Sequence, residues 1–223
     1  MRRLKCVRPG GIFHFAGERF VVLEQRRSGT FVLLDRVLED CTFHGGETVN
    51  DRGSYIGSIL EKRIAEWLDG LRCTDRERDA ILPFKVELSC VDQSKSYGTV
   101  LTEAAPLTYR QFEQYRELIP VVKGGWWLAT PWGQRKKRHS LLDGIYDAWI
   151  AFDDGCCYGS RSIDPHGVRP AMLLDSALKV HVERKCRRTD RKAAPVPPVL
   201  KNFYITDERA YLRLLKILDE GKE

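Results

Sequence analysis

The stretch GIFHFAGERFVVLEQRRSGTFVLL, residues 11–34, decides the fold class. Apolar and β-branched residues form three strand-like runs, at 12–15, 19–24 and 30–34, and glycine-containing turns at 16–18 and 26–29 separate them. Three short strands joined by tight turns are typical of successive β-hairpins. The chain is therefore predicted to begin with an antiparallel sheet.

Helices are predicted in the middle of the chain. Residues 56–68 carry apolar side chains at helical spacing, and Gly70 follows where that helix should end. Capping boxes that begin at Thr74 and Thr108 predict two shorter helices, the first ended by Pro83 and the second by Pro120. A strand is expected at 84–91, and a loop between it and Thr108.

Strand-like runs return after residue 124 and continue to residue 182. Strands, then helices, then strands predict an α+β domain with a mainly antiparallel sheet and two or three helices, assigned to residues 1–186. Residues 187–203 are basic and contain prolines, which indicates an extended linker. Residues 204–223 predict a C-terminal amphipathic helix whose apolar face must dock, on its own domain more readily than on a partner or a second copy of the chain.

Composition excludes several classes of protein. The 223 residues are 43% hydrophobic and 30% charged, which excludes a disordered chain, and no apolar run approaches the ~20 residues that a membrane-spanning helix needs. Seven cysteines, an odd number without a CxxC pair, argue against a disulfide framework and a structural zinc. No signal peptide follows the basic N-terminus. We therefore expect a cytoplasmic protein with reduced thiols, no cofactor and no membrane partner.

The net charge of +6 is concentrated in two segments. Arg135–Arg138 contributes +4 and residues 184–192 contribute +5, so the other residues together carry −3. Such segments attract polyanions or an acidic protein face, although solvated loops have the same composition.

No P-loop, GxGxxG, HExxH or GxSxG motif occurs, and the five histidines lack metal-ligand spacing, so the sequence favours binding over catalysis. Trp132, in a predicted turn before the first basic segment, is the best candidate for an exposed aromatic anchor. We expect its loop to lie at the same end of the domain as the turn at Asp153 and Asp154. The predicted binding residues are Trp132, Arg135, Lys136, Lys137, Arg138, His139, Tyr146, Asp153 and Asp154.

Other side chains are predicted to be structural. Trp67 and at least one of Trp126 and Trp127 should be buried in the core. Arg169, in an apolar run, should pair with a carboxylate.

Three segments resemble one uncharacterised bacterial and phage domain family. They are Trp126–Pro131, residues 148–155 and residues 167–171, which resemble its WWLRSPG…VxxDG…GVRPAL signature, and Ala65–Gly70 resembles its IRxWLNG helix. The resemblance implies a C-type-lectin-like fold, in the branch shared with formylglycine-generating enzymes and retroelement variable proteins. It also implies that loops between the late strands bind a ligand or a partner. No copper-binding cysteine pair of the formylglycine-generating type can be placed, which argues against that activity.

The expected function is therefore non-enzymatic recognition of a macromolecular partner, a protein or nucleoprotein, by an accessory or counter-defence factor of a phage or mobile element. The alternative is direct nucleic-acid binding through residues 135–138 and 184–192.

Overall fold

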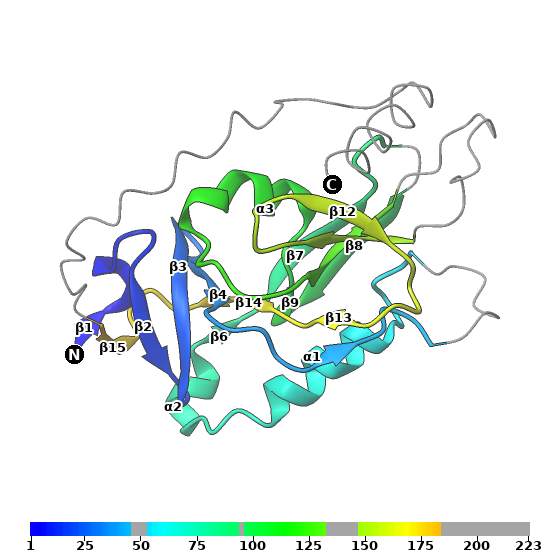
Figure 1. Cartoon of the computed structure of the whole chain (residues 1–223). Helices are drawn as coiled ribbons and strands as arrows, with labels where there is room; N and C mark the ends of the chain where they lie inside the picture. Colours follow the sequence, from blue (N-terminus) through cyan, green and yellow to red (C-terminus); the bar gives the residue numbers. More distant parts are fainter. Residues whose placement is uncertain (46–52, 94–95, 133–146, 184–223) are drawn as a thin grey trace, which may run out of the picture. The chain divides into compact units, whose positions relative to one another are not determined.

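The computed structural model describes residues 1–45, 53–93, 96–132 and 147–183 (Figure 1). The larger of its sheets has eight strands, paired antiparallel. Seven of them follow one another in space as β1 (Arg2–Arg3), β15 (Lys179–Val182), β2 (Ile12–Phe15), β3 (Glu18–Arg26), β4 (Gly29–Leu34), β14 (Pro170–Leu174) and β6 (Ile81–Leu82). The eighth, β9 (Ala104–Pro106), pairs with β14 beside β6.

A second sheet carries the late strands. Its order is β12 (Cys157–Ser160), β11 (Ala148–Ala151), β10 (Trp126–Pro131), β13 (His166–Gly167) and β5 (Asp40–Cys41), with β10 and β13 parallel and the other pairs antiparallel. β7 (Phe84–Ser89) and β8 (Ser96–Thr102) form a separate antiparallel ribbon. The described chain is thus mostly antiparallel sheet with few helices, which confirms the predicted α+β class.

The helices begin where local capping chemistry starts them. They are α1 (Ile59–Asp69), α2 (Asp75–Asp79) and α3 (Tyr109–Tyr115), with single 3₁₀ turns η1 (Leu4–Cys6) and η2 (Arg116–Leu118). The capping boxes predicted at Thr74 and Thr108 are both formed. In α1 the cap is Ser58, whose hydroxyl accepts the Glu61 N–H at 2.9 Å, so the helix starts later than Ile56, the first residue of the predicted stripe.

The first hairpins have the predicted turns. β2 and β3 are joined by Ala16 and Gly17, both with positive φ, as a tight two-residue turn requires. A bulge at Leu23 shifts the register of β3 against β4. Beyond it, Glu24 accepts a hydrogen bond from the Tyr115 hydroxyl, and that bond lowers the pKa of the Glu24 carboxyl. The bulge therefore ties the first sheet to the end of α3.

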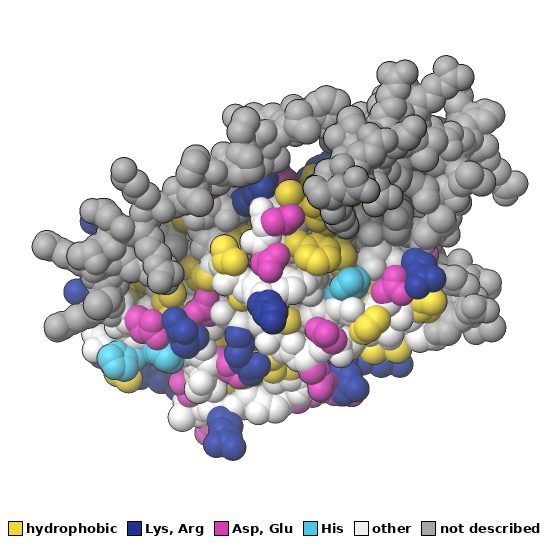
Figure 2. Space-filling view, viewed as in Figure 1, with side chains coloured by type: hydrophobic (Ala, Val, Ile, Leu, Met, Phe, Trp, Pro, Cys, Tyr) yellow, Lys and Arg dark blue, Asp and Glu magenta, His cyan; other side chains and the backbone are white. Residues whose placement is uncertain are grey.

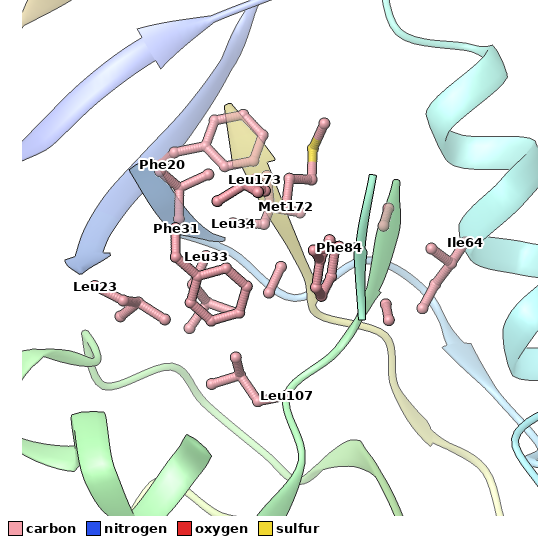
Figure 3. Packing of buried hydrophobic residues seen from close by; sticks show 14 of the residues in the cluster. Phe20, Leu23, Phe31, Leu33, Leu34, Ile64, Phe84, Leu107, Met172 and Leu173 are labelled. Atoms are coloured by element: carbon pink, nitrogen blue, oxygen red, sulfur yellow. The ribbon is translucent and has the colours of Figure 1, made fainter. Parts of the chain in front are cut away.

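The core lies between the eight-stranded sheet and the elements that cover it (Figure 3). Phe31 of β4 is at its centre, with its ring 5.5 Å from that of Phe84 and 6.0 Å from that of Tyr115. Leu107 and Ile64 bring the α3 and α1 sides of the chain to the same cluster. Because α1 and β7 both contribute, the helices and the ribbon are held by burial of apolar area.

Trp126 and Trp127 are both buried, which confirms the core prediction for this strand. Since neighbours on a strand point to opposite faces, β10 is covered on both sides. Trp126 packs edge-on against Phe112 of α3, with ring centroids 5.7 Å apart. Trp127 packs against Phe43 at 5.2 Å and donates its indole N–H to the Cys41 carbonyl at 2.8 Å.

Two structural predictions were wrong. Trp67 is only half-buried, because α1 turns one edge of the ring toward an open pocket while the other side packs near Phe20. Among the described residues, no carboxylate lies within ion-pair distance of Arg169, although the charge of Asp35 opposes the effect of burial on its pKa. Arg169 instead donates to the backbone carbonyls of Leu34 at 2.9 Å and Pro120 at 3.1 Å. Leu34 is the last residue of β4 and Pro120 follows η2, so these carbonyls are free to accept hydrogen bonds from the buried guanidinium. Burial lowers the pKa of Arg169 to about 10.

The ribbon strand β8 occupies part of the predicted loop before Thr108. Both faces of this edge strand are largely exposed, so its sequence, SYGTVLT, needs no alternation of apolar and polar residues. The pattern that predicts a strand is therefore missing. The predicted linker 187–203 and C-terminal helix 204–223 lie outside the described residues. Among the residues that are described, no helix is long and apolar enough to cross a membrane.

Candidate binding surface

The end of strand β10 positions Trp132. Pro131 is opposite Ala148 of β11, and the Trp132 N–H donates to the Asp147 carbonyl at 2.9 Å, which extends the pairing by one step. The Trp132 carbonyl in turn accepts the Cys90 thiol at 3.4 Å. Trp132 is therefore fixed by its backbone on both the strand and the ribbon side.

Three aromatic side chains pack against one another at this end, and we call Tyr109, Trp149 and Trp132 the aromatic cluster. The Trp149 ring lies 4.7 Å from Tyr109 and 4.3 Å from Trp132 between centroids. All three residues are half-buried. The Trp149 indole N–H is buried and has no hydrogen-bond acceptor among the described residues. The cluster is thus a preformed apolar platform that is open on part of its surface.

Local sequence explains why Tyr109 joins the cluster. The capping box at Thr108 starts α3, and Tyr109 is the first helical residue. Its N–H, which a helix start leaves without an intrahelical partner, donates to the Thr130 hydroxyl at 2.8 Å. That bond joins the start of α3 to β10, one strand away from Trp149.

Two further chain segments reach the same end. A side chain at Gly53 would come within 2.8 Å of the Asp147 carbonyl and 3.2 Å of the Tyr97 hydroxyl. Glycine at position 53 therefore allows the backbone there to lie close to Tyr97 of the ribbon and to the Asp147 carbonyl.

The predicted binding residues that the structure describes, Trp132, Asp153 and Asp154, do not lie at one end of the sheet. Trp132 was expected to be exposed, but it packs against Trp149 and is half-buried. Asp153 and Asp154 lie in an exposed turn, as predicted. That turn joins β11 to β12 beside Trp126, at the opposite end of β10 from Trp132. The expectation of a common end was wrong, because successive connections of an antiparallel meander alternate between its ends. Arg135, Lys136, Lys137, Arg138, His139 and Tyr146 lie outside the described residues.

The described part of the chain has no basic excess. Its residues include 20 Lys and Arg against 22 Asp and Glu, so they carry a formal charge of −2. On the face seen in Figure 2, cationic and anionic side chains are interspersed. The positive charge of the protein therefore belongs to segments 135–138 and 184–192, the first of which begins three residues after Trp132.

One serine–histidine contact, which the sequence did not predict, has the residue types of a catalytic pair. The Ser160 hydroxyl and His166 Nε2 are 2.7 Å apart, and burial lowers the pKa of His166. Ser160, however, is only 6% exposed, and no described carboxylate is hydrogen-bonded to His166. The pair closes the turn between β12 and β13. Within the described ranges, no three His, Cys, Asp or Glu side chains are placed to hold a metal ion.

No protein-family model, curated protein or solved structure matches the chain.

Proposed function

We propose that this protein is a non-enzymatic binding module that grips a macromolecular partner, a protein or nucleoprotein, at the end of the domain marked by the aromatic cluster. The observation that carries the proposal is the packing of Tyr109, Trp149 and Trp132, three large aromatic side chains that are each partly exposed. Large aromatic side chains in preformed clusters are the usual anchors of protein interfaces, because they bury much area at little entropic cost.

The charge distribution supports an acidic partner surface. The four cations at 135–138 begin three residues after Trp132, whereas the described residues carry a formal charge of −2. An acidic partner surface would be attracted to the cations and then anchored on the rings. The Trp132 ring packs against Trp149 with centroids 4.3 Å apart, which favours contact with an apolar protein side chain over insertion between bases.

The partner is to be identified by co-purification from the native host, with and without nuclease. Binding kinetics are then measured for two variants, Trp132→Ala and a replacement of Arg135, Lys136, Lys137 and Arg138 by serine. Loss of a Trp anchor of about 2 kcal/mol would weaken binding roughly thirtyfold, mainly through faster dissociation. Loss of the cations should slow association and flatten its salt dependence.

A control variant, Asp153→Asn with Asp154→Asn, changes the turn at the opposite end of β10 and should bind normally. If the first two variants bind as tightly as the parent, the aromatic cluster is not the binding surface. If only the control binds poorly, the partner is held at the other end of the sheet.

Direct nucleic-acid binding is the second candidate, favoured by the two basic segments of the sequence. It predicts affinity that falls steeply with salt and depends little on base sequence. A complex that survives nuclease treatment and moderate salt would argue against it.

The finer fold assignment also belongs to this proposal. We propose a C-type-lectin-like fold of the family with the WWLRSPG…GVRPAL signature, and a role as accessory or counter-defence factor of a phage or mobile element. The support is the order of its motifs along the chain and the central, buried position of Trp126 and Trp127 in the second sheet.

A further inference from the structure

A pocket of about 330 Å³ lies beside α1, away from β10's aromatic end, and its volume is at the lower end of the range for small-ligand sites. Helix α1, which contacts β5 (Figure 1), forms one wall. The residues just before β5 and just after β13 form the other. The lining residues are Leu38, Glu39, Arg63, Glu66, Trp67 and Val168.

The pocket has a fixed apolar wall. The Leu38 N–H donates to the Val168 carbonyl at 2.8 Å, which holds these two side chains on neighbouring backbone segments. Across from them lies the half-buried ring of Trp67, whose other side packs near Phe20, with ring centroids 6.4 Å apart. A ligand with a short aliphatic chain could therefore cover the exposed part of the indole and the Leu38 side chain together.

The polar residues of the pocket have an excess of negative charge. Arg63 lies 3.0 Å from a Glu66 oxygen and 3.6 Å from a Glu39 oxygen, so one guanidinium is shared by two carboxylates. All three side chains are at least half exposed, so both carboxylates are reachable from solvent. The cluster lacks one positive charge, and an anionic ligand would be repelled.

We propose that this pocket binds a primary alkylammonium group on a chain of about four methylenes, the shape of a lysine side chain. The methylenes lie along Leu38, Val168 and the Trp67 ring, as lysine stems cover apolar surface elsewhere in proteins. The ammonium lies between Glu39 and Glu66, within reach of the indole face, where a cation is attracted by the ring quadrupole. The site is independent of the aromatic cluster and of the partner proposed for it.

The test is an NMR titration of the intact protein with n-butylammonium chloride, followed on the tryptophan indole N–H signals. Trp67→Phe identifies the Trp67 signal by its disappearance. We expect that signal to shift saturably, with a Kd on the order of 1 mM for a ligand of this size. 1-Pentanol, which lacks the charge, and butyrate, which reverses it, should leave the signal unshifted at the same concentrations.

Variants test the charge arrangement. Glu66→Gln should weaken n-butylammonium binding about two- to fivefold, as expected for one exposed ion pair, and Glu103→Gln, an exposed glutamate outside the pocket, should not. Arg63→Ala should tighten binding, because both carboxylates are then free. A merely structural role for Arg63 would give weaker binding or none.

Two arms distinguish the sources of the ammonium group. A lysine-containing peptide that binds more tightly than n-butylammonium indicates a peptide site, and equal affinity indicates a free amine. A Trp67 signal that does not shift with either probe, that shifts equally with 1-pentanol, or whose response is weakened by Arg63→Ala would overturn the proposal.

Discussion

Two tryptophan-to-phenylalanine substitutions should have clearly different costs, although both residues belong to the predicted core. Trp127→Phe removes a fully buried indole whose N–H donates to the Cys41 carbonyl, and the smaller ring leaves space beside Phe43. The lost hydrogen bond should cost about 1 kcal/mol, and the cavity left by the missing part of the indole adds to that cost. The free energy of unfolding should therefore fall by about 2–4 kcal/mol.

Trp67→Phe should cost less than about 1 kcal/mol. The Trp67 ring is half in the pocket, and its N–H has no acceptor among the described residues, so phenylalanine loses little area and no hydrogen bond. Urea unfolding followed by circular dichroism gives both values, provided that the slope with denaturant is the same as for the parent. Equal losses for the two variants, or a larger loss for Trp67→Phe, would refute this account of the two environments.

Two other predictions concern titration and thiol chemistry. Tyr115→Phe removes the hydroxyl that donates to Glu24 and accepts from Arg26, and should destabilise the fold by about 1 kcal/mol at neutral pH. The pKa of Glu24 is lowered in the folded state, so the ionised carboxylate stabilises the fold at pH values above its ordinary pKa of 4.5. This stabilisation is lost as the pH falls through the folded-state pKa. The stabilities of parent and variant should therefore converge in acid. Under native conditions, iodoacetamide should modify the exposed Cys6 before the buried Cys41, since burial raises the Cys41 pKa to about 11; mass spectrometry reads the order, and a reaction at Cys41 before Cys6 would contradict it.

The sequence predicts local structure well where chemistry within a few residues decides it. The Ala16–Gly17 turn and the capping boxes at Thr74 and Thr108 depend on contacts at most three residues apart, and all are found. Burial of at least one of Trp126 and Trp127 was also predicted correctly. Neighbouring large apolar residues on a strand point to opposite faces, and both are buried because both faces of the strand are covered.

Long-range placement could not be obtained in the same way. Arg169 finds the carbonyls of Leu34 and Pro120, which are 135 and 49 residues away, and no local pattern indicates them. The aromatic cluster depends likewise on how α3 meets β10 through the Tyr109–Thr130 bond. The central place of Trp149 between two rings follows only from the sheet order, which puts β11 beside β10.

The place of β14 in the larger sheet has a consequence for how the chain folds during synthesis. Pro170–Leu174 is nearly the last strand made, yet it lies between β4 on one side and β6 and β9 on the other. Until it leaves the ribosome, the hydrogen-bonding edge of β4 has no strand to pair with, and apolar residues such as Phe31 and Leu33 lack part of their cover. In the nascent chain, this edge of β4 therefore stays unpaired until β14 has been synthesised. Unpaired strand edges and exposed apolar side chains promote aggregation, so the chain should depend most on chaperones during the interval of translation between β4 and β14.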